Sequence, residues 1–163
     1  MTGAELIAEE PAVNAGHCPV HCPVVPRVAV LFARADSHYK TLPDCEVYDM
    51  ERDARTYDGP WPVVAHPPCR AWATLRHHAK PRPDERNLAR LAVALVREFG
   101  GVLEHPAKTK AWASHGLAAP VRIGWQRTIN GDWVCEVWQS AYGHRANKAT
   151  WLYYHGTNPP FNL

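Results

Sequence analysis

Residues 83–105, with the sequence PDERNLARLAVALVREFGGVLEH, decide the fold of this chain. Apolar residues recur at helical spacing through the middle of this stretch, Asp84 occupies the N-cap position, and two glycines end the pattern, which predicts a helix over 83–99. The run after the first glycine, 101–105, predicts a short strand. A further strand is predicted over 61–66, and the order of strand, helix and strand favours a right-handed crossover and a parallel sheet.

Other apolar runs extend this sheet on both sides of the crossover. The β-branched run at 27–33 and the shorter run at 45–49 predict two more buried strands. Near the C-terminus, 132–139 and 149–155 predict an antiparallel pair separated by a turn around Gly143. The sequence therefore predicts an α/β protein with a mostly parallel sheet, flanking helices and an antiparallel pair of C-terminal strands.

Length and composition agree with one folded domain. The chain has 163 residues, of which 46% are hydrophobic and 21% are charged, enough for a core of its own. We expect a single α/β domain over 27–158. A flexible appendage should precede it over 1–26, where prolines interrupt any periodicity, and a short tail should follow over 159–163.

Charge, cysteine content and hydropathy limit the classes of function. The net charge of +2 is too small for binding of nucleic acid by phosphate neutralisation alone, so any such contact must be local. Five cysteines, an odd number, and the lack of an apolar leader at the N-terminus favour a reducing cytoplasm. No apolar run approaches the roughly 18 residues that cross a bilayer, so we expect no contact with a membrane.

The loops at one edge of the predicted sheet are the place to look for a site. Ligands of an open parallel sheet bind outside the carboxyl ends of its strands, where neighbouring loops converge. Four segments fall at such ends, which predicts one shared crevice: Phe32–Ser37, Asp49, His66–Arg70 and Glu104–Pro106.

The segment His66-Pro67-Pro68-Cys69 carries the sharpest chemical signal. Two prolines stiffen the loop that leaves a strand and hold the following thiol over the edge of the sheet. A thiolate at this place could act as a nucleophile if a neighbouring cation, hydrogen-bond donor or base stabilises it. The alternative is a small buried cysteine after a Pro-Pro turn.

Three motifs in this chain, taken in order, resemble those of the DNA cytosine C5-methyltransferases, particularly the compact forms found in phages. The motifs are Pro67-Pro68-Cys69 followed by Trp72, Glu104-His105-Pro106 after a strand, and Gln139–Gly143 with Lys148-Ala149-Thr150. The resemblance spans roughly Val28 to Tyr154. It implies a reduced Rossmann-like fold of the class I methyltransferase kind, in the cytoplasm of a host cell if a phage encodes the protein.

The resemblance also implies roles for individual residues. Cys69 would add to C6 of a pyrimidine, and Glu104 would bind the N3 and N4 edge of the base, where it absorbs the charge that the addition pushes into the ring. His66 and His105, which replaces the family's asparagine, would be further catalytic groups. The substrate would be cytosine in a nucleic acid or nucleotide, held by Pro68, Arg70, Trp72, Gln139, His144, Arg145 and Lys148.

The cofactor implied by the resemblance is S-adenosylmethionine. Its binding residues would come from the ends of the first two strands: Phe32, Arg34, Asp36, Ser37 and Asp49. The family has a glycine-rich loop after the first strand, whereas Leu31–Ser37 of this chain contains no glycine.

Two other functions remain open from the sequence. One is a metal-dependent enzyme acting on a nucleobase or nucleotide, with His66, His105 or His144 and either Cys69 or Glu104 as ligands of zinc or iron. The other is an inactive scaffold of the same fold that binds nucleic acid or a host protein.

Two further patterns bear on these functions. The matched spacing of the histidines and cysteines in 17–22 allows a separate zinc site in the N-terminal segment. Basic residues gather over 70–86, and the seven tryptophans could include a stacking platform for bases, although most should lie in the core.

Overall fold

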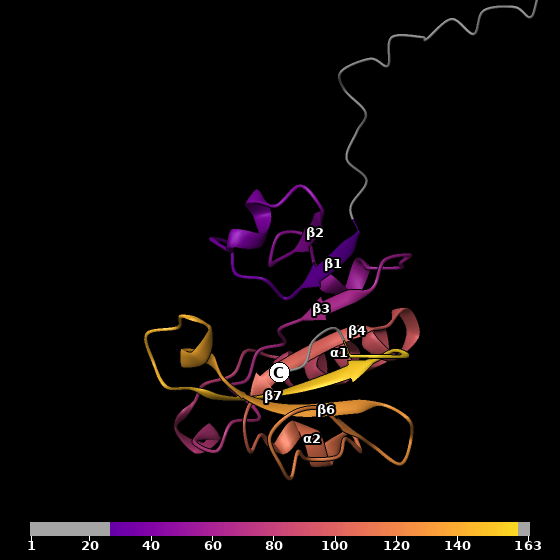
Figure 1. Ribbon diagram of the computed structural model, residues 1–163. Helices are drawn as coiled ribbons and strands as arrows, with labels where there is room; N and C mark the ends of the chain where they lie inside the picture. The colour runs from indigo at the N-terminus through magenta and orange to yellow at the C-terminus, as the bar shows by residue number, and fades with distance from the viewer. Residues whose placement is uncertain (1–26, 160–163) are drawn as a thin grey trace, which may run out of the picture.

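Seven strands form one mixed sheet in the order β2-β1-β3-β4-β7-β6-β5 (Figure 1). The computed structural model describes residues 27–159, so the predicted appendage, its candidate zinc ligands and most of the predicted tail lie outside the described residues. The strands are β1 (Val28–Leu31), β2 (Cys45–Tyr48), β3 (Val63–Ala65), β4 (Gly101–Pro106), β5 (Gln126–Arg127), β6 (Trp133–Trp138) and β7 (Ala149–His155).

The sheet divides into a parallel half and an antiparallel half. β2, β1, β3 and β4 pair in parallel, whereas β7 runs antiparallel to both of its neighbours, β4 and β6. β6 therefore runs in the same direction as β4. The predicted α/β class and the predicted antiparallel pair of C-terminal strands are confirmed.

Helices cover the sheet sparingly. α1 (Glu85–Phe99) makes the predicted crossover from β3 to β4 and contacts β3, β4 and β7. α2 (Lys110–Ser114) follows β4. Short 3-10 turns occupy the loops: η1 (His38–Thr41), η2 (Ala54–Thr56), η3 (Arg76–His78) and η4 (Gln139–Tyr142). In the described part of the chain, no helix has the length and hydropathy that a bilayer span requires.

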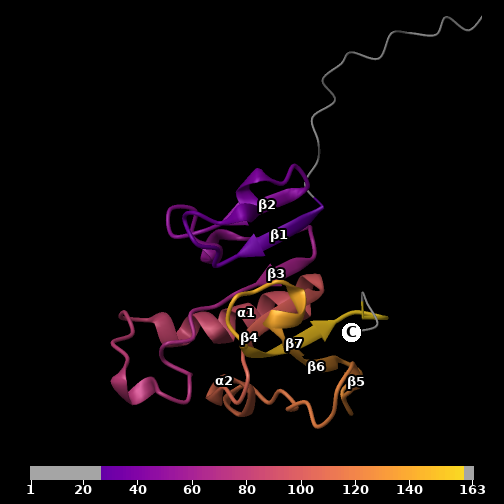
Figure 2. The same cartoon turned by 60° about the vertical axis from the view of Figure 1, so that its left-hand side comes forward.

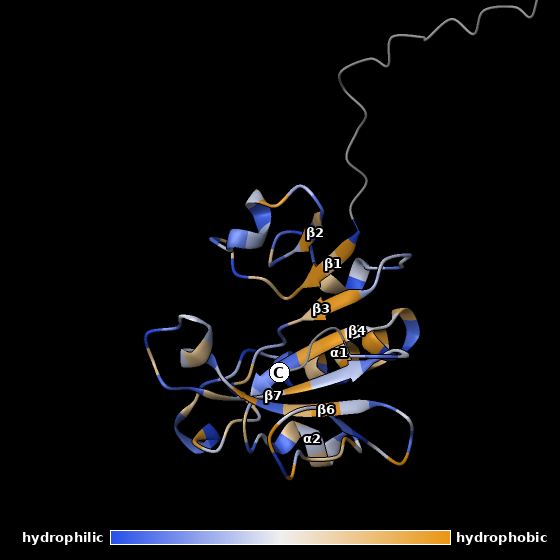
Figure 3. Cartoon of the chain, viewed as in Figure 1, coloured by the Kyte–Doolittle hydropathy of each residue, from blue (hydrophilic) through white to orange (hydrophobic). Residues whose placement is uncertain are grey.

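The main core lies on the face of the sheet that α1 covers. Alternate residues of β1 and β3, such as Leu31 and Ala65, are fully buried there against Ala92 and Val96 of the helix. Figure 3 shows the hydrophobic colour concentrated on β1, β3 and β4. Because successive residues of a strand point to opposite faces, this core also fixes which residues of β4 face away from α1.

The ends of two elements differ from the prediction for local reasons. The first strand stops at Leu31 because Phe32 takes a φ of 62°, in the left-handed region, so the chain turns there without a glycine. The helix begins at Glu85, and Asp84 is its N-cap residue as predicted. With a φ of 65°, however, Asp84 makes no capping hydrogen bond, and its carboxylate lies 3.3 Å from Arg55 instead.

A close approach between β3 and β4 depends on Gly101. Its φ is 115°, which favours glycine, and a Cβ atom at this position would overlap the backbone of Val63. Gly101 pairs directly with Val63 in the parallel ladder. Any larger residue would therefore push the two central strands apart.

Gly101→Ala should lower the free energy of unfolding by at least about 3 kcal/mol, because it adds backbone overlap to an unfavourable φ. Gly116→Ala is the matched control: Gly116 also has a positive φ, 67°, but no atom lies within 4 Å of the added Cβ. The control should cost only about 1 kcal/mol. Urea denaturation measures both, and equal losses would contradict the close approach.

Candidate functional site

Glu104, near the end of β4, collects side chains from three distant segments of the chain. Its Oε2 lies 3.3 Å from Nδ1 of His66, its Oε1 accepts a hydrogen bond of 3.3 Å from the amide of Gln139, and Lys148 Nζ lies 3.5 Å from Oε1. The Glu104 side chain is 19% exposed. The carboxylate is thus partly removed from water but still accessible to a small group.

Strand pairing explains why these residues meet. Ala65 pairs with Leu103, so the next residues of the two strands, His66 and Glu104, lie side by side. β7 pairs with β4 on its other side, and Lys148 directly precedes β7. The backbone N–H of Gln139 donates to the carbonyl of Lys148, which holds the two donors together.

The environment of Glu104 favours its ionised form. Burial alone would raise the pKa of this carboxyl group, but the hydrogen bond with His66 and the positive charge of Lys148 outweigh burial, and the pKa lies below its ordinary value. At neutral pH the site presents a carboxylate. Such a group accepts hydrogen bonds and does not donate them.

Tyr39 completes the site, although nothing in the sequence pointed to it. Its ring stacks on the imidazole of His66, with centroids 5.8 Å apart and planes 28° apart. Burial, Cys45 and the nearby Glu104 raise the pKa of its hydroxyl group, so it stays protonated. Tyr39 belongs to the single turn η1, in the loop between β1 and β2, where no periodic pattern marks it.

His105 lies on the other face of β4. The residue pairs with Trp151, is 1% exposed and packs near Trp112, whereas Glu104 pairs with Leu152 on the opposite face. Burial lowers the pKa of His105 to about 4, so its ring is neutral at neutral pH. The structure therefore does not bring His105 together with Glu104 at one surface.

The proline loop, His66–Cys69, lies between a cavity and the Glu104 cluster, which Glu104 forms with His66, Gln139 and Lys148. His66, at its start, contacts Glu104, and Pro68 lines a cavity of about 590 Å³. Cys69 is a half-buried free thiol at the end of this loop. Its carbonyl oxygen accepts hydrogen bonds from the backbone of Trp72 and Ala73, which fixes the turn that follows.

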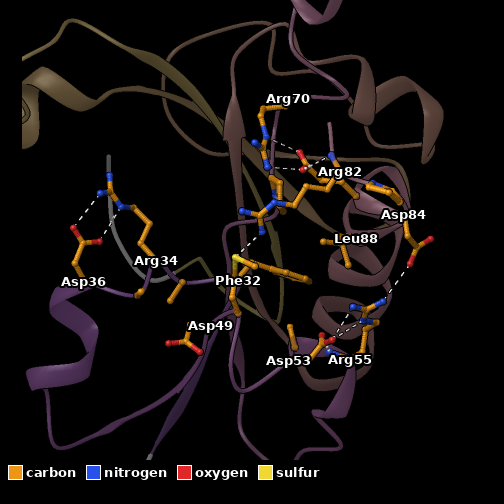
Figure 4. A pocket seen from close by; sticks show the side chains of 17 residues that line it. Phe32, Arg34, Asp36, Asp49, Asp53, Arg55, Arg70, Arg82, Asp84 and Leu88 are labelled. Atoms are coloured by element: carbon orange, nitrogen blue, oxygen red, sulfur yellow. Dashed lines mark hydrogen bonds and ion pairs between the residues drawn. The ribbon is translucent and has the colours of Figure 1, made fainter. Parts of the chain in front are cut away.

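The cavity opens at the carboxyl ends of β1 and β2 and extends to the start of α1 (Figure 4). Its volume lies in the range of pockets that hold a nucleotide or another small ligand. Apolar groups such as Ala33, Ala54 and Leu88 line it together with a charged rim. Much of this rim is paired: Arg34 with Asp36, and Arg70 with Glu85 at 2.6 Å.

Four of the five residues predicted to bind the cofactor line this cavity: Phe32, Arg34, Asp36 and Asp49. The fifth, Ser37, caps η1 instead. Asp49 already accepts two backbone N–H bonds and a contact of 2.5 Å from Lys40, whose hydrogen bond is the main cause that lowers the Asp49 pKa to about 2. Its remaining lone pairs are the ones that a ligand could use.

Several predicted substrate-binding residues have partners within the protein. Trp72 is 5% exposed, and its indole N–H donates to the carbonyl of Arg86. The Nε and Nη2 atoms of Arg70, which form one edge of its guanidinium group, donate to the two carboxylate oxygens of Glu85. His144 is exposed and contacts Ala146 in its own loop.

The metal-dependent alternative gains no support from the described residues, and the candidate zinc ligands of 17–22 lie outside them. Across residues 27–159, no group of three or more His, Cys, Asp or Glu side chains converges as ligands of a metal ion would.

Comparisons with known protein families, with curated proteins and with solved structures found no match to this chain.

Lys148→Met should raise the pKa of Glu104, because it removes a positive charge that favours the carboxylate. A lowered pKa stabilises the fold above the ordinary pKa of glutamate, and this stabilisation is lost as the pH falls through the pKa of the folded state. The stability difference between parent and variant should therefore be largest near neutral pH and shrink in acid.

NMR titration of the Glu104 side-chain carboxyl carbon measures this pKa directly. Lys110→Met is the matched control, since Lys110 is exposed on α2 and forms no salt bridge within the described chain. The control should leave the Glu104 pKa unchanged. An unchanged pKa in Lys148→Met as well would mean that the ammonium group does not act on this carboxylate.

Proposed function

We propose that this protein modifies a pyrimidine base, cytosine, in a nucleic acid or nucleotide by a mechanism like that of the cytosine C5-methyltransferases. One observation carries the proposal. The three motifs on which the resemblance rests are far apart in the sequence, yet side chains of the second and third motifs, Glu104 and Gln139 with Lys148, meet His66, the residue that directly precedes the first motif. The mixed sheet, with four parallel strands followed by antiparallel C-terminal strands, is also compatible with the Rossmann-like fold that the resemblance implies.

The ionised Glu104 suits recognition of cytosine. Its oxygens can accept a hydrogen bond from the N4 amino group of cytosine, whereas uracil has an acceptor oxygen at that place. Gln139 and Lys148 hold the carboxylate in position and are donors for other acceptors of the base. The cluster therefore distinguishes the two pyrimidines by the direction of one hydrogen bond.

Cys69 is the nucleophile of the proposed reaction. Its thiolate forms a bond to C6, and the electron pair of the C5–C6 double bond moves into the ring, which makes C5 nucleophilic. C5 would then take a methyl group from the donor, whose sulfur keeps the electron pair of the broken bond. Water would take the proton from C5 as the C5–C6 double bond re-forms and the thiolate leaves. Donors at the base edge lower the barrier because they stabilise the charge that develops in the ring.

The 590 Å³ cavity is the candidate site for S-adenosylmethionine, which supplies an electrophilic methyl group when bound. Its size and its mixture of apolar and charged lining fit a nucleoside with a charged tail. Phe32, in the left-handed conformation, gives the loop after β1 a sharp turn without glycine. Asp49 would hold the ribose through its remaining lone pairs. Pro68 lines this cavity while His66 of the same loop contacts Glu104, so the donor and the base would meet at the proline loop.

A single-stranded oligonucleotide containing 5-fluorocytosine tests this proposal. Fluorine cannot leave C5 as a proton does, so the adduct with Cys69 should persist once C5 has been methylated. Intact-mass measurement with S-adenosylmethionine should show a protein–DNA adduct for the parent. Cys69→Ser should lower adduct formation by at least about a thousandfold.

Cys45→Ser is the control, because Cys45 is also a free, half-buried thiol but lies on β2. It should form as much adduct as the parent. Equal adduct in Cys69→Ser and the parent would refute the mechanism, and absence of any adduct or methyl transfer in the parent would refute the enzymatic function.

A further inference from the structure

The cavity beside the proline loop has one lining cation without a carboxylate partner. Three of its four lining arginines form salt bridges with carboxylates of the same lining: Arg34 with Asp36, Arg55 with Asp53 and Asp84, and Arg70 with Glu85. The fourth, Arg82, forms no salt bridge with any residue of 27–159. A ligand that carries an anion can therefore pair with Arg82 without displacing a carboxylate of the protein.

The side chain of Arg82 extends over the cavity toward a sulfur atom (Figure 4). Its Nη1 atom lies 2.6 Å from Sδ of Met50, and its side chain makes no other hydrogen bond with the described residues. A thioether is a weak acceptor, whereas a guanidinium group has five N–H donors. Most of the donors of Arg82 are therefore left for a ligand.

The backbone that carries Arg82 is fixed by its neighbours. Pro81 and Pro83 flank it and restrict the dihedral angles of the segment. The N–H of Arg82 donates to Oε2 of Glu85 at 3.0 Å, and its carbonyl accepts from the N–H of Glu85 at 3.2 Å. Glu85 is only 2% exposed, so this anchor belongs to the packed start of α1.

Glu85 also ties together the two ends of a long excursion of the chain. Figure 2 shows the segment between β3 and α1, in magenta, projecting from the body of the protein. The Glu85 carboxylate binds the Arg70 guanidinium at one end of the excursion and the Arg82 backbone at the other. Arg82 is thus held at the cavity before any ligand arrives, which lowers the entropy cost of binding.

We propose that Arg82 binds the anionic group of the ligand that occupies this cavity. A guanidinium fork pairs with a carboxylate or a phosphate through two parallel hydrogen bonds. The inference rests on the proposed function for the identity of the ligand: in S-adenosylmethionine the anion is the carboxylate of the amino-acid tail. The assignment complements that of Asp49, because a carboxylate suits the hydroxyl donors of a ribose and a cation suits the tail. A nucleotide phosphate is the other source of the same anionic chemistry.

Isothermal titration calorimetry with two matched pairs of ligands tests the proposal. S-adenosylhomocysteine and its decarboxylated analogue differ in the carboxylate and share the ammonium group, and adenosine monophosphate and adenosine differ in the phosphate. The parent should bind S-adenosylhomocysteine about tenfold or more tightly than the analogue, as expected for a hydrogen-bonded ion pair. Arg82→Leu should abolish this preference, and it should bind the analogue no more weakly than the parent does, which shows that the cavity is intact.

Lys80→Leu is the matched control. Lys80 is an exposed cation two residues before Arg82, but it does not line the cavity. The control should keep the preference of the parent. An equal loss in both variants would mean that the general positive charge of this segment, rather than Arg82, attracts the anion.

Four results would overturn the proposal: no preference for the anion in either pair, a preference that persists in Arg82→Leu, an equal loss in Lys80→Leu, or no binding of any of the four ligands by the parent. The proposed function fails separately. A preference that depends on Arg82 and is confined to adenosine monophosphate would keep the role of Arg82 and refute S-adenosylmethionine as the ligand. A Cys69 adduct together with binding of S-adenosylhomocysteine that does not depend on Arg82 would refute the role of Arg82 alone.

Discussion

The parallel pairing of β3 with β4 is the constraint on which the site depends. α1 connects these strands, and Gly101 lets their backbones approach closely enough to share a ladder. This register sets His66 beside Glu104, although 38 positions separate them in the chain. A shift of one residue would turn Glu104 toward α1 and bury a charge without its partners, which is costly.

Two environments meet at the proline loop. On one side, Glu104 stays ionised because nearby donors outweigh its partial burial. On the other side, paired charges surround a cavity with an apolar lining. Prolines restrict the backbone between the two, so the loop can hold its thiol at low cost in conformational entropy. The proposed transferase activity depends on this arrangement, because it requires two different ligands to meet at one nucleophile.

The sequence predicted the elements with strong periodicity and missed those without it. α1 and the central strands follow from apolar spacing, and the cavity at the ends of β1 and β2 follows from the rule for parallel sheets. Glu104–Pro106, which was expected to share this crevice, does not line the cavity. Tyr39 and β5 could not be predicted, because a single turn and a two-residue strand leave no pattern. His105 was expected beside Glu104 from its place in the motif, but alternation along β4 directs it into the core. Trp72 was assigned to substrate, whereas packing against α1 and α2 residues buries it.

The affinity of the parent and of Glu104→Gln for single strands that differ only in one cytosine or uracil tests the central claim most directly. If the ionised carboxylate accepts from the amino group of the base, the parent should prefer cytosine by about tenfold, and the variant, whose amide can both donate and accept, should lose this preference. Equal preferences in the two proteins would contradict the claim that Glu104 binds the edge of the base.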